Sequence, residues 1–491
     1  MFEDYLAVKN ALLHSFPRLN VLVVGDVMLD KYLWGDVTRV SQEAPVPVVH
    51  LQRRSASLGG AAYVAGNLAA LGLGVNLAGF LGKDQDAELV REECQRSKIG
   101  SDALISVSDY CTVTKTRVYA GERQLLRVDE EFTALRCDED ADKLLAAIDL
   151  ALANAKPDAV ILSDYAKGAC SPYLCQQLIR RCRTLQIPVY VDPKGRDYAK
   201  YAGATAIKPN RPEINDIALA MGWNTHSPIE SARRLREYLD LDFVAVTLGA
   251  QGIALVTEDE AHEIPTEARE VFDVSGAGDA VIAALVAALA AKVSLFDSIV
   301  FANLAAAEVV ARVGSVCVDR QELLVALQET GRGTDQRKLY SLEDLKTLVS
   351  AWRARGLKVA FTNGCFDLLH AGHIRLLEDS AAQTDRLIVG INSDASVTRL
   401  KGPDRPIMPE AQRATVLSAL ECIDAVVVFE EDTPMRVIQE IRPTLLIKGG
   451  DYTKETVVGA EFVESYGGSV ALIPLVKGVS TTLLAEAITK L

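Results

Sequence analysis

The sequence predicts an α/β protein with two domains, on three observations. The chain has 491 residues, which is too long for one ordinary domain. Both halves alternate short runs rich in Val and Ile with helical stretches, a pattern typical of parallel strands covered by helices on both faces. A polar, Gly-containing segment without apolar periodicity, residues 328–340, separates the halves. We therefore expect one domain over residues 1–330, a linker over 331–340 and a second domain over 341–491.

Eight apolar runs are expected to form the strands of two sheets. They are residues 20–26, 158–164, 188–193 and 242–249 in the first half, and 358–364, 386–392, 424–429 and 444–450 in the second. Because open α/β sheets bind ligands at the carboxyl ends of their strands, the Asp, Asn and Gly residues that close these runs are expected at the sites of chemistry. Residues 110–127 alternate like an antiparallel ribbon and predict a lid.

Two further segments predict helices. Ser341 and Asp344 form a capping box, and the helix that they open is expected to end at Gly356. The longest uninterrupted apolar run, Ala280–Ala291, has twelve residues. Spanning a bilayer takes about 20 residues, so this run is expected to be a buried helix of a water-soluble protein.

Composition narrows the class of protein. The net charge of −14 argues against nucleic acid or an anionic membrane surface as the main partner. A hydrophobic share of 49% and a charged share of 24% exclude wholesale disorder. The nine cysteines include no C-x-x-C pair and no matching His cluster, which favours reduced thiols over zinc sites. With no signal-peptide core near the N-terminus, we expect a cytoplasmic protein.

The strongest signal in the first half is DVSGAGDA, residues 273–280, which runs directly into the apolar helix. Gly276, Ala277 and Gly278 are small enough for backbone N–H groups to approach an anion at a helix N-terminus. An ordinary explanation for Asp279 is its favourable interaction with the helix dipole, about 0.3–1 kcal/mol. Directly after a candidate anion hole, it instead indicates a base that accepts a hydroxyl proton during phosphoryl transfer.

These residues resemble the ribokinase-like (PfkB) carbohydrate kinases, whose closing signature D-T-x-G-A-G-D is similar to residues 273–279. The resemblance implies a three-layer α/β/α domain with a small β lid, Asp279 as catalytic base and Gly276–Gly278 as the anion hole. LGGAAYVAGNLAALG, residues 58–72, resembles the family's di-glycine signature, although Tyr63 stands where the family usually has Asn. KPNRPE (208–213) and VTLGAQG (246–252) resemble its N-x-x-E element and nucleotide loop. They imply contacts to ATP and magnesium by Asn210, Arg211, Pro212, Glu213, Thr247, Gly249 and Gly252.

Several residues are candidates for binding the sugar. Asp26 and Asp30 lie beyond the first strand, where they would bind sugar hydroxyls; turn and cap chemistry is the alternative explanation. A sugar phosphate also needs cations, although each candidate could equally be a solvated surface charge. The full sugar-binding set that we expect is Asp26, Asp30, Gly59, Gly60, Asn67, Lys115, Arg117, Asp164, Lys167 and Lys194.

In the second half, FTNGCFDLLHAGH (361–373) follows the first apolar strand. His370 and His373 are spaced i, i+3, which puts both on one face of a helix near its first turn. Between them, Ala371 and Gly372 would let a phosphate chain approach the backbone while both imidazoles donate to its oxygens. A zinc site is the competing hypothesis, but no third ligand with supporting spacing is evident.

This segment is similar to the H-x-G-H cytidylyltransferase superfamily, whose members use CTP or ATP. The resemblance implies a Rossmann-like nucleotidyltransferase domain in which His370 and His373 are catalytic, and no metal site of its own because magnesium arrives with ATP. An acceptor phosphate attacks the α-phosphate in line, so catalysis is positioning and charge stabilisation. Lys448 and Asp451 are further candidates for nucleotide or sugar contacts. The implied ATP-binding residues are Asn363, Gly364, Phe366, Asp367, Gly372, Lys401, Ser480, Thr481 and Thr482.

Nearly all of residues 15–491 resembles the bifunctional heptose 7-phosphate kinase/heptose 1-phosphate adenylyltransferases of Gram-negative bacteria, which help make ADP-heptose for lipopolysaccharide core. The closer match is carried by residues 25–49, 164–169, 191–195, 362–373 and 447–459. It implies ATP-dependent phosphorylation at O1 of heptose 7-phosphate, adenylyl transfer from ATP to heptose 1-phosphate, and a homodimer formed through the kinase domain.

Two alternatives remain open from the residues alone. Spacing does not separate adenine from cytosine, so another sugar kinase joined to a CTP-using transferase is one of them. The other is a nucleotide-sensing or scaffold protein with degenerate sites, against which Asp279, the anion hole and both histidines speak.

Overall fold

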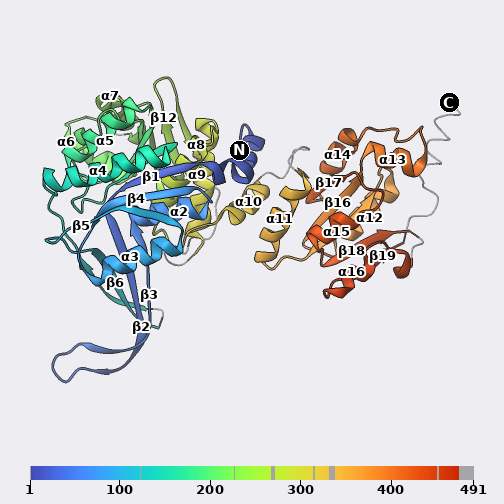
Figure 1. Ribbon diagram of the computed structural model, residues 1–491, viewed down its shortest axis with the longest axis horizontal. Coiled ribbons are helices and arrows are strands. Elements are labelled where there is room, and N and C mark those ends of the chain that lie inside the picture. The colour runs from blue at the N-terminus through green and yellow to red at the C-terminus, as the bar shows by residue number, and fades with distance from the viewer. Residues whose placement is uncertain are drawn as a thin grey trace. The chain divides into compact units, whose positions relative to one another are not determined.

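The computed structural model describes residues 2–121, 123–225, 227–266, 271, 273–312, 316–330, 338–450 and 453–474. Its contacts divide the chain into two compact units, Met1–Leu323 and Leu324–Leu491. Each unit contains a mainly parallel sheet with helices, so the predicted α/β class is confirmed (Figure 1). Of the predicted linker, residues 331–337 lie outside the described part of the chain. Leu339 and Tyr340 form a short strand, β14, at the edge of the second sheet.

The first unit is built on a nine-stranded sheet in the order β13-β12-β11-β10-β9-β8-β1-β4-β5. Its neighbouring strands pair in parallel, except at the β11–β12 and β12–β13 edge. The four predicted strands of this half are confirmed as β1, β8, β9 and β11. The bounds are β1 Asn20–Gly25, β4 Gly74–Leu81, β5 Ile99–Ser106, β8 Ala159–Ser163, β9 Val189–Asp192, β10 Ala206–Ile207, β11 Phe243–Thr247, β12 Ile253–Val256 and β13 Ala261–Ile264.

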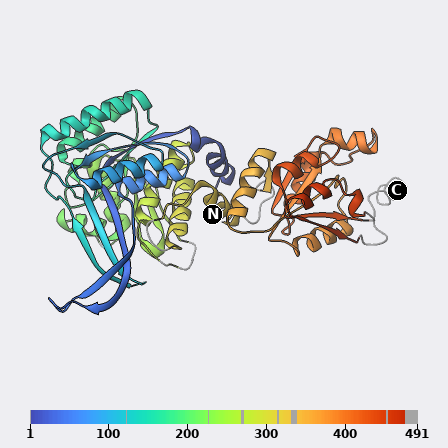
Figure 2. The ribbon, with the colours of Figure 1, turned by 60° about the horizontal axis from the view of Figure 1, so that its bottom comes forward.

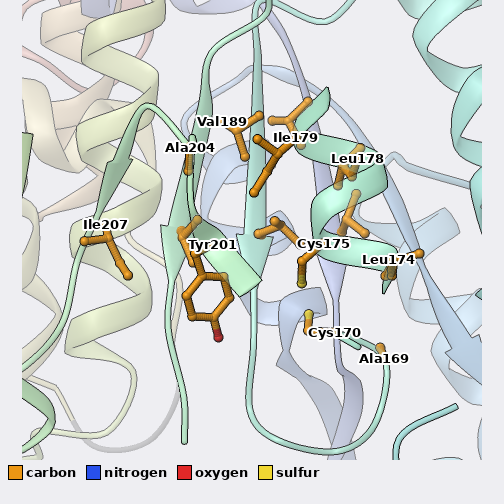
Figure 3. Packing of buried hydrophobic residues seen from close by; sticks show 14 of the residues in the cluster. Ala169, Cys170, Leu174, Cys175, Leu178, Ile179, Val189, Tyr201, Ala204 and Ile207 are labelled. Carbon is orange, nitrogen blue, oxygen red and sulfur yellow. The ribbon is translucent and has the colours of Figure 1, made fainter. Parts of the chain in front are cut away.

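Apolar helix faces cover both sides of this sheet. The helices are α1 Tyr5–Asn10, α2 Ala61–Ala70, α3 Gln85–Arg96, α4 Asp138–Ala155, α5 Pro172–Thr184, α6 Arg211–Ala220, α7 Pro228–Leu239, α8 Ala277–Ala290 and α9 Leu295–Val310. On one side, α4 and α5 pack on the central strands, and Figure 3 shows Ile179 of α5 beside Val189 of β9. Elsewhere in the unit, α8 packs against α2 and α9. Its small, almost completely buried side chains allow this close approach, and they confirm the predicted apolar helix.

A separate four-stranded sheet in the order β3-β2-β6-β7 forms the lid. Its strands are β2 Val27–Val40, β3 Pro47–Gly60, β6 Val113–Ala120 and β7 Arg123–Glu130. The antiparallel pair β6–β7 confirms the ribbon expected over residues 110–127. Strands β2 and β3 were not predicted from the sequence. Their far end projects beyond the rest of the unit (Figure 2). Because β2 starts two residues after β1, the lid begins at the carboxyl end of the central sheet.

The second unit is built on a six-stranded parallel sheet in the order β14-β17-β16-β15-β18-β19. Its strands are β14 Leu339–Tyr340, β15 Val359–Gly364, β16 Arg386–Asn392, β17 Ala425–Phe429, β18 Leu445–Gly449 and β19 Ser469–Ile473. The four predicted strands of this half are confirmed as β15 to β18. Strand order reverses at β15, which has β16 on one side and β18 on the other, so the crevice at their carboxyl ends is where a ligand is expected.

The helices of this part are α10 Arg320–Thr330, which includes the boundary between the units, and α11 Leu342–Ala354, α12 Ala371–Ala381, α13 Asp394–Lys401, α14 Glu410–Ser418, α15 Met435–Ile441 and α16 Ala460–Ser465. Ser341 caps α11 by accepting from the Asp344 N–H at 3.1 Å, and Gly356 follows the helix with φ +74°, as predicted. Within the described residues, no helix has the length and hydrophobicity needed to cross a membrane.

Candidate functional site

A cavity of about 670 Å³ lies at the carboxyl ends of strands β8 to β11 in the first unit. Its polar wall brings together residues from distant parts of the sequence: Asp164, Asp192, Lys208, Asn210, Glu213, Thr247 and Asp279. Its lining also includes apolar side chains, among them Val274, Ala307 and Val310. A pocket of this size with apolar lining and convergent polar groups suits a nucleotide.

The N-terminus of α8 opens onto this cavity. Gly276 is the N-cap with φ +78°, in the left-handed region that glycine tolerates. A Cβ at Gly276 would lie 2.6 Å from Cε1 of Tyr63, whose hydroxyl donates to the Val316 carbonyl at 3.2 Å. A Cβ at Gly278 would lie 3.4 Å from Nζ of Lys208. The first turn of α8 thus lies close to the ammonium group of Lys208. Both the helix N-terminus and this ammonium group favour the binding of an anion.

Asp279 lies in the first turn of α8 and lines the cavity. The hydroxyl of Tyr165 donates a hydrogen bond to its Oδ1. Burial and the nearby charge of Asp192 raise the pKa of Asp279 to about 7, against the lowering effects of Tyr165, Lys208 and Lys115. A carboxylate that loses its proton near pH 7 is well matched to the task of a general base.

Lys208 is a residue that the sequence analysis missed. Its Nζ lies 2.9 Å from Oδ1 of Asp192, and its side chain is only 4% exposed. Although burial alone would lower the pKa of Lys208, the charge of Asp192 raises it, so the ammonium group is retained. The signal was available, because Lys208 directly follows β10 and opens the KPNRPE segment.

The expected nucleotide residues gather around the start of α6. Asn210 caps this helix, and its Oδ1 and the Glu213 carboxylate each accept from the other's N–H at 2.9 Å. Asn210 also bridges to Thr247, next to the loop where Gly249 and Gly252 have φ +64° and +96°. Arg211 donates to Gln251 of the same loop, and Pro212 occupies the first turn of α6. Lys194, expected at the sugar, pairs with Glu213 at 2.7 Å, and its contact to the sugar stays a prediction.

Two expected sugar-binding carboxylates anchor a loop in the structure. Asp26 is 1% exposed and accepts from the backbone N–H groups of Tyr165, Lys167 and Ala169 at 2.7, 3.0 and 2.9 Å. Asp164 accepts from the Ala166 N–H at 2.7 Å. It also accepts from Nζ of Lys200 at 2.5 Å and from the Tyr201 hydroxyl at 2.7 Å. Sugar binding by these two residues stays a prediction.

Asp30 lies where the lid joins the central sheet. Its Oδ1 accepts from Arg117 at 2.6 Å, and a Cβ at Gly59 would lie 2.9 Å from its Oδ2. Gly60, with φ +56°, passes so close to the Asp26 carbonyl oxygen that a Cβ would lie 2.5 Å from it. The di-glycine therefore lets β3 run beside the Asp30 carboxylate and the Asp26 backbone.

The remaining expected sugar ligands have separate partners. Lys167 pairs with Glu131 at 2.5 Å, and Nζ of Lys115 lies 5.9 Å from the centre of the Tyr165 ring. Asn67 is buried in α2 and donates to the Tyr63 carbonyl oxygen at 2.9 Å.

In the second unit, candidate residues meet where β15 and β18 end. Nζ of Lys448 donates to the carbonyl oxygen and Oδ1 of Asn363, at 3.2 and 2.9 Å, across 85 residues of sequence. Phe366 adopts φ +45°, and its ring comes so close to Gly364 that a Cβ there would lie 3.0 Å from Cε2. Gly364 thus makes room for the ring at the start of the loop that leads to α12.

His370 and His373 stack on one another with ring centres 3.8 Å apart and planes at 21°. His370 is the N-cap of α12, and a Cβ at Gly372 would lie 3.1 Å from its Nδ1. Among the described residues, Nδ1 of both histidines is buried without a hydrogen-bond partner. Burial, the charge of His370 and that of Lys401 lower the pKa of His373 to about 4, so its ring is neutral at pH 7. Unpartnered ring nitrogens at a helix N-terminus suit an oxygen-rich anionic ligand.

Asp367 holds the segment that follows α13. Its carboxylate accepts from the N–H groups of Ile407 at 2.6 Å and Met408 at 3.1 Å, and from the Arg405 guanidinium. Arg413, which is fully buried, donates to the carbonyl oxygens of Cys365 and Met408 at 2.7 and 3.0 Å. Neither arginine was singled out from the sequence. Asp451, Ser480, Thr481 and Thr482 lie outside the described residues.

Comparison with known proteins identifies both units. Residues 18–319 match the family described as pfkB family carbohydrate kinase, and residues 361–484 match the Cytidylyltransferase-like family. Bifunctional protein HldE of Magnetococcus marinus is 48% identical over 96% of this chain and 98% of its own length. That of Caulobacter vibrioides is 45% identical over 97% and 99%. The chain belongs to the family of bifunctional HldE proteins.

Solved structures agree on the fold of the first unit. Phosphofructokinase-2 from Escherichia coli in complex with potassium has a TM-score of 0.53 at 18% identity, covering 64% of this chain and 99% of that one. Arabidopsis thaliana ribokinase, complexed with ribose and ATP, has a TM-score of 0.50 at 20% identity, covering 63% and 98%. The predicted ribokinase-like fold is thereby confirmed, as is the prediction of a sugar kinase joined to a nucleotidyltransferase within one HldE chain.

Proposed function

We propose that this protein is a bifunctional enzyme of ADP-heptose synthesis. Its first unit phosphorylates O1 of D-glycero-β-D-manno-heptose 7-phosphate with ATP, giving the 1,7-bisphosphate. Its second unit transfers AMP from ATP to heptose 1-phosphate, giving ADP-heptose and pyrophosphate. The observation that carries this proposal is the match to HldE proteins over nearly the whole length of both chains.

In the kinase unit, Asp279 is the proposed base. It takes the proton of the sugar O1 hydroxyl while O1 bonds to the γ-phosphorus and the bond from that phosphorus to the β–γ bridging oxygen breaks, releasing ADP. Lys208 and the N–H groups of Gly276–Gly278 would balance charge on the transferring phosphoryl group. Asn210 and Glu213, which line the cavity, would help to hold magnesium bound to ATP, and that ion would offset charge on the phosphates.

In the transferase unit, the acceptor needs no protein base, because a sugar phosphate is already anionic. One of its oxygens bonds to the α-phosphorus of ATP, and the bond to the leaving pyrophosphate breaks. Neutral His370 and His373 would donate hydrogen bonds to phosphate oxygens, with Lys401 close enough to influence His373 electrostatically. Ser480, Thr481 and Thr482 remain the proposed contacts to the β- and γ-phosphates.

The basic residues of the kinase unit divide between its two proposed substrates. Lys194 belongs with ATP, because it pairs with Glu213 at the nucleotide side of the cavity. Lys115 lies near Tyr165 and the base, where O1 would react. Arg117 and Lys167 are therefore the proposed ligands of the 7-phosphate. The proposal includes a kinase domain over residues 1–330 and a transferase domain over 341–491, a cytoplasmic location and a homodimer formed through the lid.

The deciding experiment measures ATP- and Mg²⁺-dependent ADP release over a panel of sugar phosphates, followed by nucleotide-sugar formation from heptose 1-phosphate with ATP or CTP. We expect turnover selective for heptose 7-phosphate, and for ATP in the second reaction. Turnover with a different sugar would keep the mechanism but overturn the pathway. Nucleotide binding without turnover on any acceptor would instead support a sensor.

A further inference from the structure

The contact between Tyr165 and Asp279 joins residues 114 positions apart in the sequence. Tyr165 comes two residues after β8, and Asp279 lies in α8, so only the fold brings them together. Both line the cavity. Within the described residues, Oδ1 of Asp279 accepts from the Tyr165 hydroxyl, whereas Oδ2 has no hydrogen bond. One oxygen of the proposed base is thus held and the other is available to a ligand.

Tyr165 is presented by a loop that the buried carboxylates fix at successive backbone positions. Asp26 accepts from the N–H groups of Tyr165, Lys167 and Ala169, and Asp164 accepts from that of Ala166. Ala166 adopts φ +57°, a conformation that such bonds can maintain in a residue other than glycine. A backbone tied at four of five consecutive residues leaves the phenol little freedom to move away from Asp279.

We propose that Tyr165 is a positioning residue for Asp279 in the kinase reaction. A carboxylate has a broad, two-fold torsional preference about its last bond, so packing alone selects its orientation poorly. The hydroxyl of Tyr165 fixes Oδ1 and so directs Oδ2 to accept the proton of the sugar hydroxyl. This role rests on the proposed kinase function. It also gives Asp26 and Asp164 a function that does not require them to touch the sugar.

The proposed role predicts a change in the pKa of Asp279 as well as in its orientation. Removing the Tyr165 hydroxyl removes a bond that favours the ionised carboxylate, so the pKa of Asp279 should rise above about 7. The other groups near Asp279 would be unchanged, and they are Asp192, Lys208, Lys115, Tyr63 and Cys317. If Tyr165 only filled space, loss of its hydroxyl would leave the apparent pKa of the acid limb in the pH–rate profile unchanged.

The test compares Tyr165→Phe with Tyr198→Phe in the full chain, measuring kcat and KM for the kinase reaction from pH 5.5 to 9. Tyr198 is the matched control, because it is 1% exposed and its hydroxyl has no hydrogen-bond partner among the described residues. For Tyr165→Phe we expect kcat at pH 7 to fall by about tenfold to a hundredfold, with both KM values within about twofold and the acid limb moved to higher pH. Tyr198→Phe should match the wild type.

Unchanged kcat and an unmoved acid limb in Tyr165→Phe would overturn the proposal. So would a loss that is equal at every pH and accompanied by a rise in KM. Adenylyl transfer by the same preparation reports on its integrity, and thermal unfolding reports on folding. If Tyr165→Phe does not fold, 3-fluorotyrosine at position 165, a stronger donor, should move the acid limb to lower pH, and no movement would contradict the proposal.

The assay uses whichever sugar phosphate the wild type turns over. Failure of the heptose assignment therefore appears as a change of substrate in the wild type, whereas failure of the Tyr165 proposal appears only in the variant.

Discussion

In the first unit burial raises the pKa of Asp279 to about 7, whereas in the second burial lowers the pKa of His373 to about 4. The cause is the same, because removal from water disfavours whichever form is charged. The two shifted pKa values suit two different acceptors. A sugar hydroxyl must lose a proton, so the kinase benefits from a base poised near neutrality. A sugar phosphate is already ionised, so the transferase needs neutral donors that do not take a proton.

The units also differ in how a buried carboxylate holds a loop after the first long strand. In the first unit, burial and the charge of Asp164 raise the pKa of Asp26 to about 6, against three backbone N–H bonds. In the second, Asp367 accepts from two N–H groups and from Arg405, which together hold its pKa below the usual value in spite of burial. Among the described residues, Asp26 is therefore held by backbone donors alone, whereas Asp367 also has a cation partner.

The largest expected effect comes from Asp279→Asn, which removes the base and keeps the size of the side chain. Sugar phosphorylation should fall by about 10²–10⁴-fold, since that is the usual contribution of general base catalysis. Adenylyl transfer should persist, and coupled assays of ADP and pyrophosphate release measure the two reactions in one preparation. Because the variant no longer buries an ionisable group, its thermal unfolding should move upward. Loss of both activities would show that the two sites are coupled.

The reciprocal change, His370→Ala, should reduce adenylyl transfer by about 10²–10³-fold, as expected when one donor to a charged transition state is lost. Sugar phosphorylation by the same preparation should stay at the wild-type rate. Pyrophosphate release from ATP and heptose 1-phosphate is the measurement. Full transfer activity in this variant would contradict the role proposed for the stacked imidazoles.

Replacing the two loop-holding carboxylates should affect stability unequally. Asp367→Asn leaves Arg405 without its partner, and we expect it to destabilise its unit by about 3 kcal/mol. Asp26→Asn loses acceptor capacity but also removes a buried charge, so about 1 kcal/mol is expected. Hydrogen exchange in increasing urea measures the free energy of unfolding of each unit separately. Equal losses would remove the distinction between a carboxylate held by backbone donors alone and one that also has a cation partner.

The two reactions should respond differently to pH. With the pKa of Asp279 at about 7, the base is protonated below that pH, so kcat of the kinase at pH 6 should be about a tenth of its plateau. The pKa of His373 at about 4 leaves its ring neutral throughout this range, so adenylyl transfer should lack that acid limb. Steady-state rates between pH 5.5 and 9 test both statements. A kinase rate that is flat across this range would argue against Asp279 as the base.

The smallest effects concern the basic residues around the kinase cavity. Lys167→Ala should raise KM for the sugar phosphate about tenfold, or about 1.4 kcal/mol, while Lys194→Ala should raise KM for ATP by a similar factor. Each variant is the control for the other, because they remove the same group on different sides of the site. A Lys194→Ala variant affecting only the sugar phosphate would reverse this assignment and restore the original sequence-based expectation.

The order of the strands along the chain, and the residues that end them, could be predicted from the amino-acid sequence. Runs such as residues 158–164 and 386–392 have no polar face, so only a sheet covered on both sides can bury them. The short-range motifs were equally accessible, because Gly276–Asp279 and His370–His373 each lie within one helical turn. Their spacing alone fixes which groups are neighbours, and the matches to known families agree with the fold and enzyme class inferred from them.

Contacts between residues far apart in the sequence are set by the folded structure and could not be predicted from the sequence. The sequence gives no reason for Tyr165 rather than another residue to contact Asp279, or for Lys448 to reach Asn363. The first contact follows from the packing of α8 against β8 and β9, and the second from the pairing of β15 with β18. The folded structure also decided that Asp26 accepts from the backbone and that Lys194 pairs with Glu213. A carboxylate at the end of a strand can bind a ligand or hold a loop. Which of these two roles a carboxylate has depends on packing by chain segments more than a hundred residues away. The local spacing of residues therefore does not predict the role.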